Sequence, residues 1–219
     1  MDILLFGMQG SGKGTQGKIL AEKYGLTVFE MGAELRKLIA SGDSLGQKIK
    51  AIVDRGDLVP DDTVMEVVSH FVQSLSPDHR ILFDGVPRTP GQGEKLLALI
   101  KKHGHDAFAL HIKLSLEEAM KRLTQRRICE KCKEVYPAFY EGDSCSVKLP
   151  GGQLCGGKLI TRHDDNTEAI QKRLDNFQKE TFPVIKRFQE IDRLIEVDGE
   201  QSIPDVTIEM IEKAAYLFT

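Results

Sequence analysis

The sequence lacks the features that place a chain in a membrane or on a polyanion. No stretch approaches the roughly 20 consecutive apolar residues that a helix needs to cross a bilayer. The opening residues, Met1-Asp2-Ile3, lack the basic region and cleavage site of a secretory signal peptide, so we expect a cytoplasmic protein. The net charge of -3 argues against a protein that coats nucleic acid or an anionic membrane, and any positive site must therefore be local.

Cysteine is scarce and is not spread along the chain. The four cysteines, Cys129, Cys132, Cys145 and Cys155, all fall in one short stretch, unlike those of a secreted disulfide scaffold, and metal binding is the first hypothesis for them. Internal repeats and low-complexity tracts are also absent. With 219 residues, 41% of them hydrophobic, the chain can bury one medium core that carries small inserted lobes.

Short apolar runs alternate with helical patterns along most of the chain. Strands are predicted at 3–6, 80–84, 107–112 and 194–197. Helices are predicted at 15–24, 63–73, 92–102, 116–127 and 167–189, with a bend or break at Pro183 in the last. This alternation predicts a parallel sheet covered by helices on both faces.

Two segments depart from this alternation. Residues 30–59 contain two short predicted helices, 33–40 and 45–55, which we interpret as a small helical lobe inserted between strands. Residues 125–165 are rich in glycine, cysteine and short β-prone pieces and are flanked by arginines. We interpret this second segment as a β-rich lobe.

Residues 7–15, Gly-Met-Gln-Gly-Ser-Gly-Lys-Gly-Thr, lie between the first predicted strand and the first predicted helix, as a phosphate-binding loop requires. Glycines let backbone N–H groups turn toward phosphate oxygens, the helix start adds positive partial charge, and Lys13 supplies a full charge. The alternative is a glycine-rich turn with an exposed lysine. The flanking strand and helix disfavour that alternative.

Residues 81–89, Ile-Leu-Phe-Asp-Gly-Val-Pro-Arg-Thr, place Asp84 at the carboxyl end of a predicted buried strand. Ligands collect at this edge of open α/β sheets. Asp84 is suited to hold Mg²⁺ through the water shell of the ion, and Arg88 is suited to bind a phosphate bidentately. An aspartate after a strand is more often a turn former, but a neighbouring phosphate-binding loop favours the metal role.

These motifs resemble those of the adenylate kinase family. Gly-Lys-Gly-Thr at 12–15 is similar to the phosphate loop of nucleoside monophosphate kinases, and Asp-Gly-x-Pro-Arg-Thr at 84–89, followed by Gln92, looks like the second family signature. The resemblance covers almost the whole chain and implies a P-loop three-layer α/β sandwich with a five-stranded parallel sheet. It implies a core of residues 1–29, 60–124 and 166–219, a helical NMP-binding lobe at 30–59, and a β-rich lid at 125–165.

The resemblance also implies a reaction and a set of site residues. The reaction is the reversible, Mg²⁺-dependent conversion of ATP and AMP to two ADP, by in-line transfer in a monomer whose lid and NMP-binding lobe close over the nucleotides. The implied catalytic residues are Lys13, Asp84, Arg88, Arg126, Arg162 and Arg173. The implied ATP-binding residues are Gly10, Ser11, Gly12, Lys13, Gly14, Thr15, Arg122, Arg126, Val135, Tyr136 and Gln201. The implied AMP-binding residues are Met31, Arg36, Asp57, Leu58, Val59, Gly85, Arg88, Arg162, Arg173 and Gln92, the last reading the acceptor adenine.

The residues themselves support some of these arginines. Arg122 and Arg126 are four apart on one predicted helix, so they share a face and would repel each other unless an anion lay near them. Asp165 and Glu168 have the spacing of a capping box at the start of the helix that carries Arg173. A solvated helix face would explain any one arginine, but several at the hinges of one lobe favour catalysis.

The sequence differs from the usual family pattern at a few positions. Met31 stands where a threonine commonly contacts the acceptor base, and Ala33 stands where an aspartate commonly helps the Mg²⁺ water shell. Cys129-x-x-Cys132 is a good zinc knuckle, but Cys145 lies ten residues before Cys155 instead of three. We expect structural Zn²⁺ on the four cysteines, and the alternative is a reduced or partly disulfide-linked lid.

Two other functions fit part of the sequence. The acceptor could be UMP or CMP, which a competition assay across acceptors would decide. The chain could also be a P-loop ATPase or switch whose zinc ribbon recruits nucleic acid or protein. Against that function, the sequence has no Asn-Lys-x-Asp guanine-reading motif, and the ribbon is bracketed by arginines that suit a nucleotide lid.

Overall fold

The computed structural model describes residues 1–137, 139–162 and 165–218, and its main feature is a sheet of five parallel strands in the order β2-β3-β1-β4-β8. The strands are β1 (Asp2–Phe6), β2 (Thr27–Glu30), β3 (Ile81–Asp84), β4 (Ala107–Lys113) and β8 (Leu194–Asp198). The predicted parallel sheet is confirmed. Strand β2, which the apolar pattern did not reveal, is an edge strand in which only Phe29 is buried.

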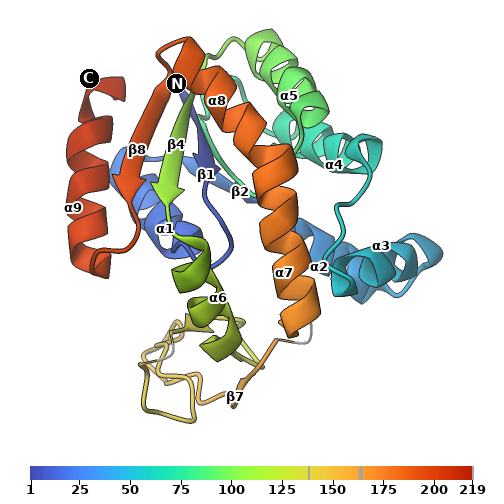
Figure 1. The fold of residues 1–219 in the computed structure, drawn as a ribbon, viewed down its shortest axis with the longest axis vertical. Coiled ribbons are helices and arrows are strands. Elements are labelled where there is room, and N and C mark those ends of the chain that lie inside the picture. The colour runs from blue at the N-terminus through green and yellow to red at the C-terminus, as the bar shows by residue number, and fades with distance from the viewer. Residues whose placement is uncertain (138, 163–164, 219) are drawn as a thin grey trace.

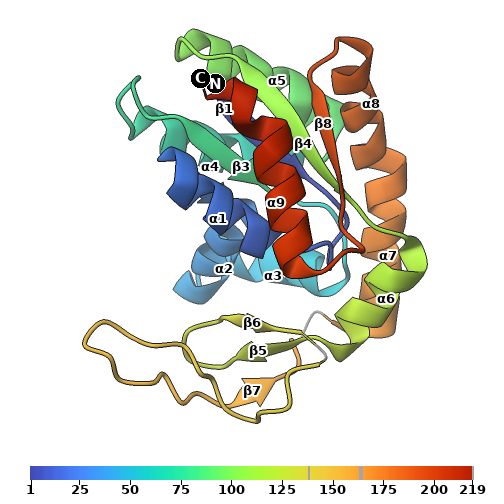
Figure 2. The same ribbon diagram turned by 90° about the vertical axis from the view of Figure 1, so that its left-hand side faces the viewer.

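Helices cover both faces of this sheet (Figure 1 and Figure 2). The cluster on one face includes residues of α1 (Lys13–Tyr24) and α9 (Ile203–Ala214). The cluster on the other face includes residues of α4 (Asp61–Gln73), α5 (Pro90–Lys102), α7 (Thr167–Asn176) and α8 (Phe182–Glu190). Residues of β1 alternate between the two clusters, because successive side chains of a strand point to opposite faces. The predicted three-layer sandwich is thus confirmed.

The residues predicted as one helix at 167–189 form consecutive helical segments, but the type of helix changes among them. A π-helical segment, η1 (Phe177–Thr181), separates α7 from α8, and Pro183 stands in the first turn of α8. Because α8 continues directly from η1, Pro183 removes an N–H group that would otherwise face a carbonyl of the preceding turn, and the change of helix type falls just before it. A short 3₁₀ turn, η2 (Ala215–Leu217), follows α9 near the end of the chain.

Two small structures interrupt the alternation of strands and helices. The first consists of α2 (Met31–Ser41) and α3 (Ser44–Asp54), which follow β2 and correspond to the two helices predicted for the inserted lobe. The second follows α6 (Leu116–Gln125) and contains an antiparallel sheet of β5 (Arg127–Cys129), β6 (Val135–Tyr136) and β7 (Leu159–Ile160). Figure 2 shows this second sheet lying apart from the main sheet.

Helix α6 ends earlier than the sequence pattern predicts. Its last residue is Gln125, and Arg126 has an extended backbone with φ -66° and ψ 137°. The prediction that Arg122 and Arg126 share one helix face is therefore wrong, because the chain leaves the helix at Arg126 to enter β5. Among the described residues, no helix combines the length and the apolar content needed to cross a membrane.

Candidate active site

The loop between β1 and α1 has the curvature of a phosphate cradle. Three of its glycines, Gly7, Gly10 and Gly12, have positive φ values of 152°, 87° and 92°. A Cβ atom added at Gly7 would lie 2.5 Å from Ser11 Oγ and 2.8 Å from Ile112 O. A side chain at this position would therefore clash with both residues and displace the loop. Gly12 is the N-cap of α1, and the exposed first turn of that helix carries Gly14 and Thr15.

Lys13 folds back over this loop. Its Nζ donates hydrogen bonds to the carbonyl oxygens of Gly7, at 2.7 Å, and Met8, at 2.9 Å. Burial lowers the pKa of Lys13 to about 8, and the positive charges of Arg88 and Arg126 also lower it, whereas Asp84 opposes the shift. The charged form of Lys13 is therefore disfavoured in the unliganded site, and a bound anion would stabilise it.

The loop also contains polar atoms without partners. Of the three buried side-chain N and O atoms that lack a hydrogen bond among the described residues, Gln9 Oε1 and Ser11 Oγ belong to this loop. Buried polar groups are nearly always hydrogen-bonded, so an unsatisfied one requires an explanation. A phosphate oxygen in the cradle would satisfy the Ser11 hydroxyl.

Two carboxylates end neighbouring strands beside the loop. Asp84 ends β3, Glu30 ends β2, and the two residues are paired in the sheet register. Burial raises the pKa of Asp84, Lys13 opposes that rise, and Glu30 adds to it. Arg36 of α2 donates to Glu30 Oε1 at 2.8 Å. Sequence reasoning missed Glu30, although a carboxylate that ends a strand is the signal that identified Asp84.

The segment after β3 holds Arg88 toward the loop. Arg88 Nε donates to the Gly85 carbonyl at 2.9 Å, and Thr181 Oγ1 donates to the Arg88 carbonyl at 2.9 Å. Gly85 has a φ of 82°, and an added Cβ would lie 3.3 Å from Arg88 Nη2. Burial lowers the pKa of Arg88, Asp84 opposes the shift, and Arg173 contributes to it. The predicted phosphate-binding guanidinium is thus fixed in place beside other charges of the site.

A buried carboxylate joins two of the predicted arginines. The side chain of Asp165 is fully buried and accepts from Arg126 Nε at 2.9 Å, from Arg126 Nη2 at 2.6 Å and from Arg173 Nη2 at 2.8 Å. Burial lowers the pKa of Arg126, and Asp165 opposes that shift. The charge of Arg162, which is half-buried, lowers the pKa of Arg126 further. Two predicted catalytic arginines therefore share a counterion that the sequence analysis did not identify, and Arg162 lies near enough for its charge to act on Arg126.

The predicted capping box at the start of α7 is wrong. The N-cap is Asn166, whose side chain accepts a hydrogen bond from Ala169 N at 2.8 Å. Asp165 stands one residue before the cap, and its carboxylate binds arginines instead of the helix end. The adjacent Asp164, which the sequence analysis did not assign a role, lies outside the described residues.

Arg122 reaches the phosphate loop from α6. Its Nε donates to Glu118 at 2.8 Å, and its Nη1 donates to the Gly199 carbonyl at 3.0 Å and, at 3.5 Å, to the Gly10 carbonyl. Gln201 lies two residues beyond Gly199 and is exposed, with its Nε2 donating to Glu209 at 2.5 Å. The structure thus brings Arg122 to the cradle and leaves Gln201 on the adjacent surface.

Two residues predicted to contact the acceptor base are buried. Met31 is 2% exposed and packs in the core, and Gln92 is also 2% exposed. Gln92 Nε2 donates to Asp61 Oδ1 at 2.8 Å, and Gln92 Oε1 accepts from Arg88 N at 2.7 Å. In the structure, both side chains are packed or hydrogen-bonded within the protein, and their contact with a base stays a prediction.

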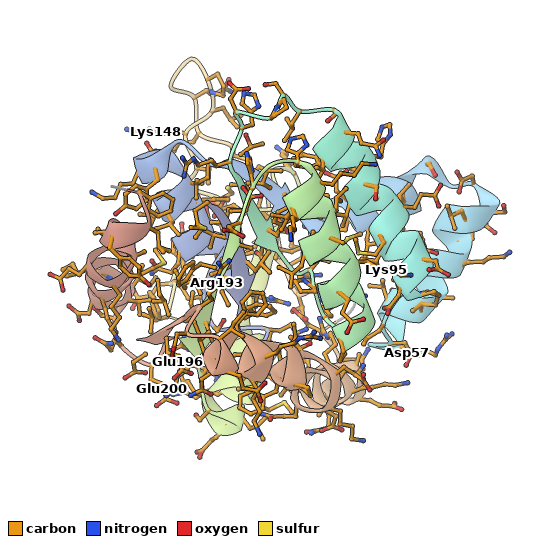
Figure 3. All side chains as sticks on the ribbon, turned by 90° about the horizontal axis from the view of Figure 1, so that it is seen from above. Asp57, Lys95, Lys148, Arg193, Glu196 and Glu200 are labelled. Atoms are coloured by element: carbon orange, nitrogen blue, oxygen red, sulfur yellow. The ribbon has the colours of Figure 1, made fainter. Side chains whose placement is uncertain are left out.

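The end of the helical insert is attached to α7. Asp57, labelled in Figure 3, is half-buried and pairs with Lys172 Nζ at 2.6 Å, and it accepts from Arg55 Nε at 3.1 Å. Hydrogen bonds from Lys172 and Arg55 lower the pKa of Asp57. Leu58 is half-buried and Val59 is buried, so this predicted nucleoside-lining segment runs between the insert and the core.

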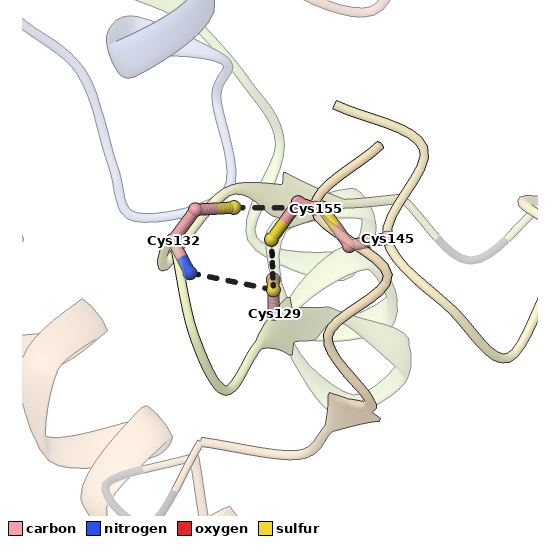
Figure 4. Close-up of side chains that lie close together, drawn as sticks. All are labelled: Cys129, Cys132, Cys145 and Cys155. Carbon is pink, nitrogen blue, oxygen red and sulfur yellow. Dashed lines mark hydrogen bonds between the residues drawn. The ribbon is translucent and has the colours of Figure 1, made fainter. Parts of the chain in front are cut away.

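The four cysteines converge beside the second sheet, with Cys129 at the end of β5 (Figure 4). Their sulfur atoms all lie within 4.8 Å of one another, with 3.6 Å between Cys129 and Cys155 and 3.4 Å between Cys132 and Cys145. Burial alone would raise the pKa of Cys129, but backbone N–H groups of Cys132 and Lys131 outweigh it, and the pKa falls to about 6. This arrangement could hold a metal ion.

The unusual spacing before Cys155 is accommodated by a hairpin. Lys148 and Leu154 pair across it in an antiparallel bridge, and Cys155 N donates to the Val147 carbonyl at 2.8 Å. The extra residues therefore project away as a loop while Cys145 and Cys155 stay together.

The two predicted ATP-binding residues of β6 differ in environment. Val135 is 50% exposed, whereas Tyr136 is buried and its hydroxyl donates to Cys145 Sγ at 3.2 Å. The Tyr136 side chain thus supports the cysteine cluster. A contact between Tyr136 and ATP would have to use its backbone or the edge of its ring.

Comparisons with known proteins agree with this geometry. The family model described as adenylate kinase matches residues 5–193. The chain is 38% identical to an adenylate kinase of Pyrococcus furiosus over 208 residues, which cover 94% of this chain and 92% of that protein. It is 35% identical to an adenylate kinase of Bacillus velezensis over 210 residues, which cover 94% of both chains. The chain belongs to the adenylate kinase family.

Proposed function

We propose that this chain transfers the γ-phosphoryl group of ATP to AMP in the space bordered by Lys13, Arg88, Arg126 and Arg173. The observation that carries the proposal is the placement of these cations: Lys13 folds over the phosphate loop, and Arg88 is held by the Gly85 carbonyl beside it. Arg126 and Arg173 share the buried carboxylate of Asp165. Burial lowers the pKa of Lys13, Arg88 and Arg126. Phosphoryl transfer needs in-line positioning and charge neutralisation more than a covalent nucleophile. A cluster of desolvated cations supplies both.

Residues on different sides of the site bind different phosphate groups. The backbone of the loop from Gly10 to Thr15 and the Lys13 ammonium bind the phosphates of ATP, and Arg122 lies beside them. Arg88 and Arg36 bind the phosphate of AMP from the other side. Arg126 and Arg173 exchange part of their pairing with Asp165 for the transferring phosphoryl group, and Arg162 joins them as the lid closes. Each cation then stabilises charge that develops on the equatorial oxygens in the transition state.

Adenylate kinases use Mg²⁺, and the residues of this site fit such an ion. Asp84 and Glu30 end adjacent strands next to the loop, and carboxylates hold Mg²⁺ directly or through its water shell. Glu30 thus offers a second carboxylate in this chain, in which Ala33 replaces the usual family aspartate. Asp84 and Glu30 would hold the ion, which would supply positive charge to neutralise the phosphates.

Residues 30–59 and 125–165 act as closing lobes on a core of residues 1–29, 60–124 and 166–219. Closure would exclude water, which would otherwise accept the phosphoryl group in place of AMP. Support comes from the weak tie between the second lobe and α1, an exposed ion pair of Lys18 Nζ and Glu134 Oε2 at 3.3 Å. An exposed pair of this kind contributes little free energy, so this tie can open at small cost while the buried pair of Asp165 and Arg173 stays at the hinge.

The cysteine cluster holds a structural Zn²⁺. Four thiolates at about 2.3 Å from a tetrahedral ion lie about 3.8 Å apart, close to the spacings between the sulfur atoms. Hydrogen bonds from Tyr136 to Cys145 and from Cys132 N to Cys129 resemble the outer contacts that orient metal-bound thiolates. When bound, Zn²⁺ crosslinks the two halves of the lid and takes no part in phosphoryl transfer.

Coupled measurement of ADP formation tests the proposal. Purified protein with Mg²⁺ and ATP is given AMP, CMP or UMP in turn, and we expect AMP to give the highest kcat/KM. ATP hydrolysis that does not depend on any monophosphate would instead indicate an ATPase or switch. A preference for CMP or UMP would retain the site and change its acceptor.

A further inference from the structure

A hydrogen-bonded network joins the start of α4 to the start of α5. Asp61, the first residue of α4, accepts from Thr89 Oγ1 through Oδ2 at 2.8 Å and from Gln92 Nε2 through Oδ1 at 2.8 Å. Thr89 is the N-cap of α5 and accepts from Gln92 N at 3.1 Å. On the other side of the amide, Gln92 Oε1 accepts from Arg88 N at 2.7 Å. Asp61 has no role in the reaction as described so far.

The two partners of the Gln92 side chain determine which way its amide points. An ionised carboxylate can only accept hydrogen bonds, so it must face the NH₂ group, and a backbone N–H can only donate, so it must face the oxygen. Exchanging the two ends of the amide would set donor against donor and acceptor against acceptor. The contacts thus leave one N–H and one oxygen lone pair of Gln92 for another partner, in a fixed order.

The Asp61 carboxylate has little room to move. Gly91 lies in the first turn of α5, and a Cβ atom added there would stand 2.9 Å from Asp61 Oδ2. Close packing of the carboxylate against that turn keeps both of its oxygens on Thr89 and Gln92. The orientation of the amide is therefore imposed by rigid elements at both ends.

We propose that Asp61 is a specificity-determining positioning residue, which selects acceptor bases with an amino group beside an unprotonated ring nitrogen by fixing the orientation of the Gln92 amide. This proposal rests on the proposed function, in which Gln92 contacts the acceptor base. Asp61 acts through Gln92 and does not touch the nucleotide.

The fixed order of donor and acceptor matches one class of base. On its Watson–Crick edge, adenine presents the N1 acceptor beside the N6 amino donor, which pair with the free N–H and the free lone pair of Gln92. Hypoxanthine has the same size and ring system but presents an N1–H donor beside the O6 acceptor. IMP would need the opposite amide orientation, which Asp61 and Arg88 N prevent. A mismatch between hydrogen-bonding groups in a built site is strongly rejected.

A neighbouring aspartate provides a matched control. Asp62 stands in the same first turn of α4 and carries the same charge, but it is exposed and pairs with Lys95 Nζ of α5 at 2.6 Å. Lys95 is labelled in Figure 3. Neutralising Asp62 repeats the loss of charge at the helix N-terminus without changing any contact of Gln92.

The test compares Asp61→Asn with Asp62→Asn in assays of AMP and IMP as acceptors. An asparagine can present either a donor or an acceptor to Gln92, so only Arg88 N then favours one orientation of the amide, and the other orientation costs less. We expect Asp61→Asn to raise KM for AMP about tenfold with kcat changed less than about threefold, and to lower the AMP-to-IMP ratio of kcat/KM about tenfold. Asp62→Asn is expected to leave both quantities unchanged. An unchanged ratio in Asp61→Asn overturns the proposal.

A double-mutant cycle separates positioning from a purely structural effect. Gln92→Leu removes the amide, so we expect a reduced AMP-to-IMP ratio that Asp61→Asn does not reduce further. An equal additional reduction in the Gln92→Leu background would show that Asp61 does not act through Gln92, and would also overturn the proposal. All assays are run well below the lowest melting temperature of the set. If the wild-type protein forms no ADP from ATP and AMP, the proposed function itself fails, which is a different result from an unchanged ratio.

Discussion

The main body and the cysteine lid differ in what stabilises them. Both faces of the five-stranded sheet pack against helices in two large apolar clusters. The buried cluster described for the lid has five residues, and three of them, Cys129, Cys145 and Cys155, are cysteines. A cluster of this size buries too little apolar surface to fold by burial alone. The candidate active site therefore lies at the edge of a well-packed sheet, whereas the lid has little apolar core, and the zinc proposed for its cysteines would have to stabilise it.

The largest effect is expected for a substitution in the phosphate loop, which belongs to the well-packed main body. Replacing Lys13 with alanine removes the ammonium from the centre of the cradle, so we expect kcat to fall by about a hundredfold to a thousandfold. The melting temperature should stay within a few degrees, because the two large clusters do not include Lys13. Coupled ADP formation and thermal unfolding measure the two quantities.

Lys18 provides the control for that substitution. It lies on the same helix, its side chain is 66% exposed, and it pairs with Glu134 of the lid. Lys18→Ala should leave kcat within about twofold. Comparable activity in Lys13→Ala and Lys18→Ala would contradict the role given to Lys13.

A smaller effect, on stability first, is expected from the lid. Cys145→Ser removes one of four sulfur ligands, so we expect loss of about one zinc per chain and a destabilisation of roughly 3 kcal/mol, equivalent to a decrease in melting temperature of about 10 °C. Metal analysis and thermal unfolding with and without a chelator measure this. Ser144→Ala, one residue away, should change neither quantity. Wild-type protein without stoichiometric zinc, and with a melting temperature that the chelator leaves unchanged, would refute the metal site.

The smallest of these effects is a pH dependence of ATP binding. The pKa of Lys13 is about 8 in the unliganded protein, and bound phosphates favour its charged form, so the pKa must be higher in the complex. Affinity is then full below pH 8 and falls as the pH rises above it, by about tenfold between pH 7 and 9, with proton uptake on binding. Calorimetry in two buffers with different ionisation enthalpies detects that uptake. Lys13→Ala should abolish it, and its persistence in that variant would assign the proton to another group.

Contiguous motifs allowed most of the fold and the centre of the site to be predicted. The phosphate loop and the segment from Asp84 to Arg88 each combine a strand, a turn and functional side chains within a few residues, so local pattern is enough to identify them. Strand β2 was not located because an edge strand with one buried residue has no apolar run. The end of α6 was misplaced because Arg126 continues the helical pattern in the sequence, although its partner Asp165 lies 39 residues away.

The residues that the sequence analysis missed share one property. Each of them lies beside a segment distant along the chain: Asp61 accepts from Gln92 of α5, Asp165 accepts from Arg126 after α6, and Glu30 is paired in register with the end of β3. Single aspartates and glutamates are common on protein surfaces, and no spacing rule separates these three from the others. Only the packed structure shows which carboxylates face a guanidinium or an amide.

The hydrogen bonds of Lys13 to the Gly7 and Met8 carbonyls have a kinetic consequence. Because the ammonium already occupies the middle of the turn, the loop acquires its final curvature when the chain folds, before any nucleotide arrives. We expect an incoming triphosphate to meet a loop that is already curved, so that only the Lys13 ammonium has to exchange carbonyl oxygens for phosphate oxygens.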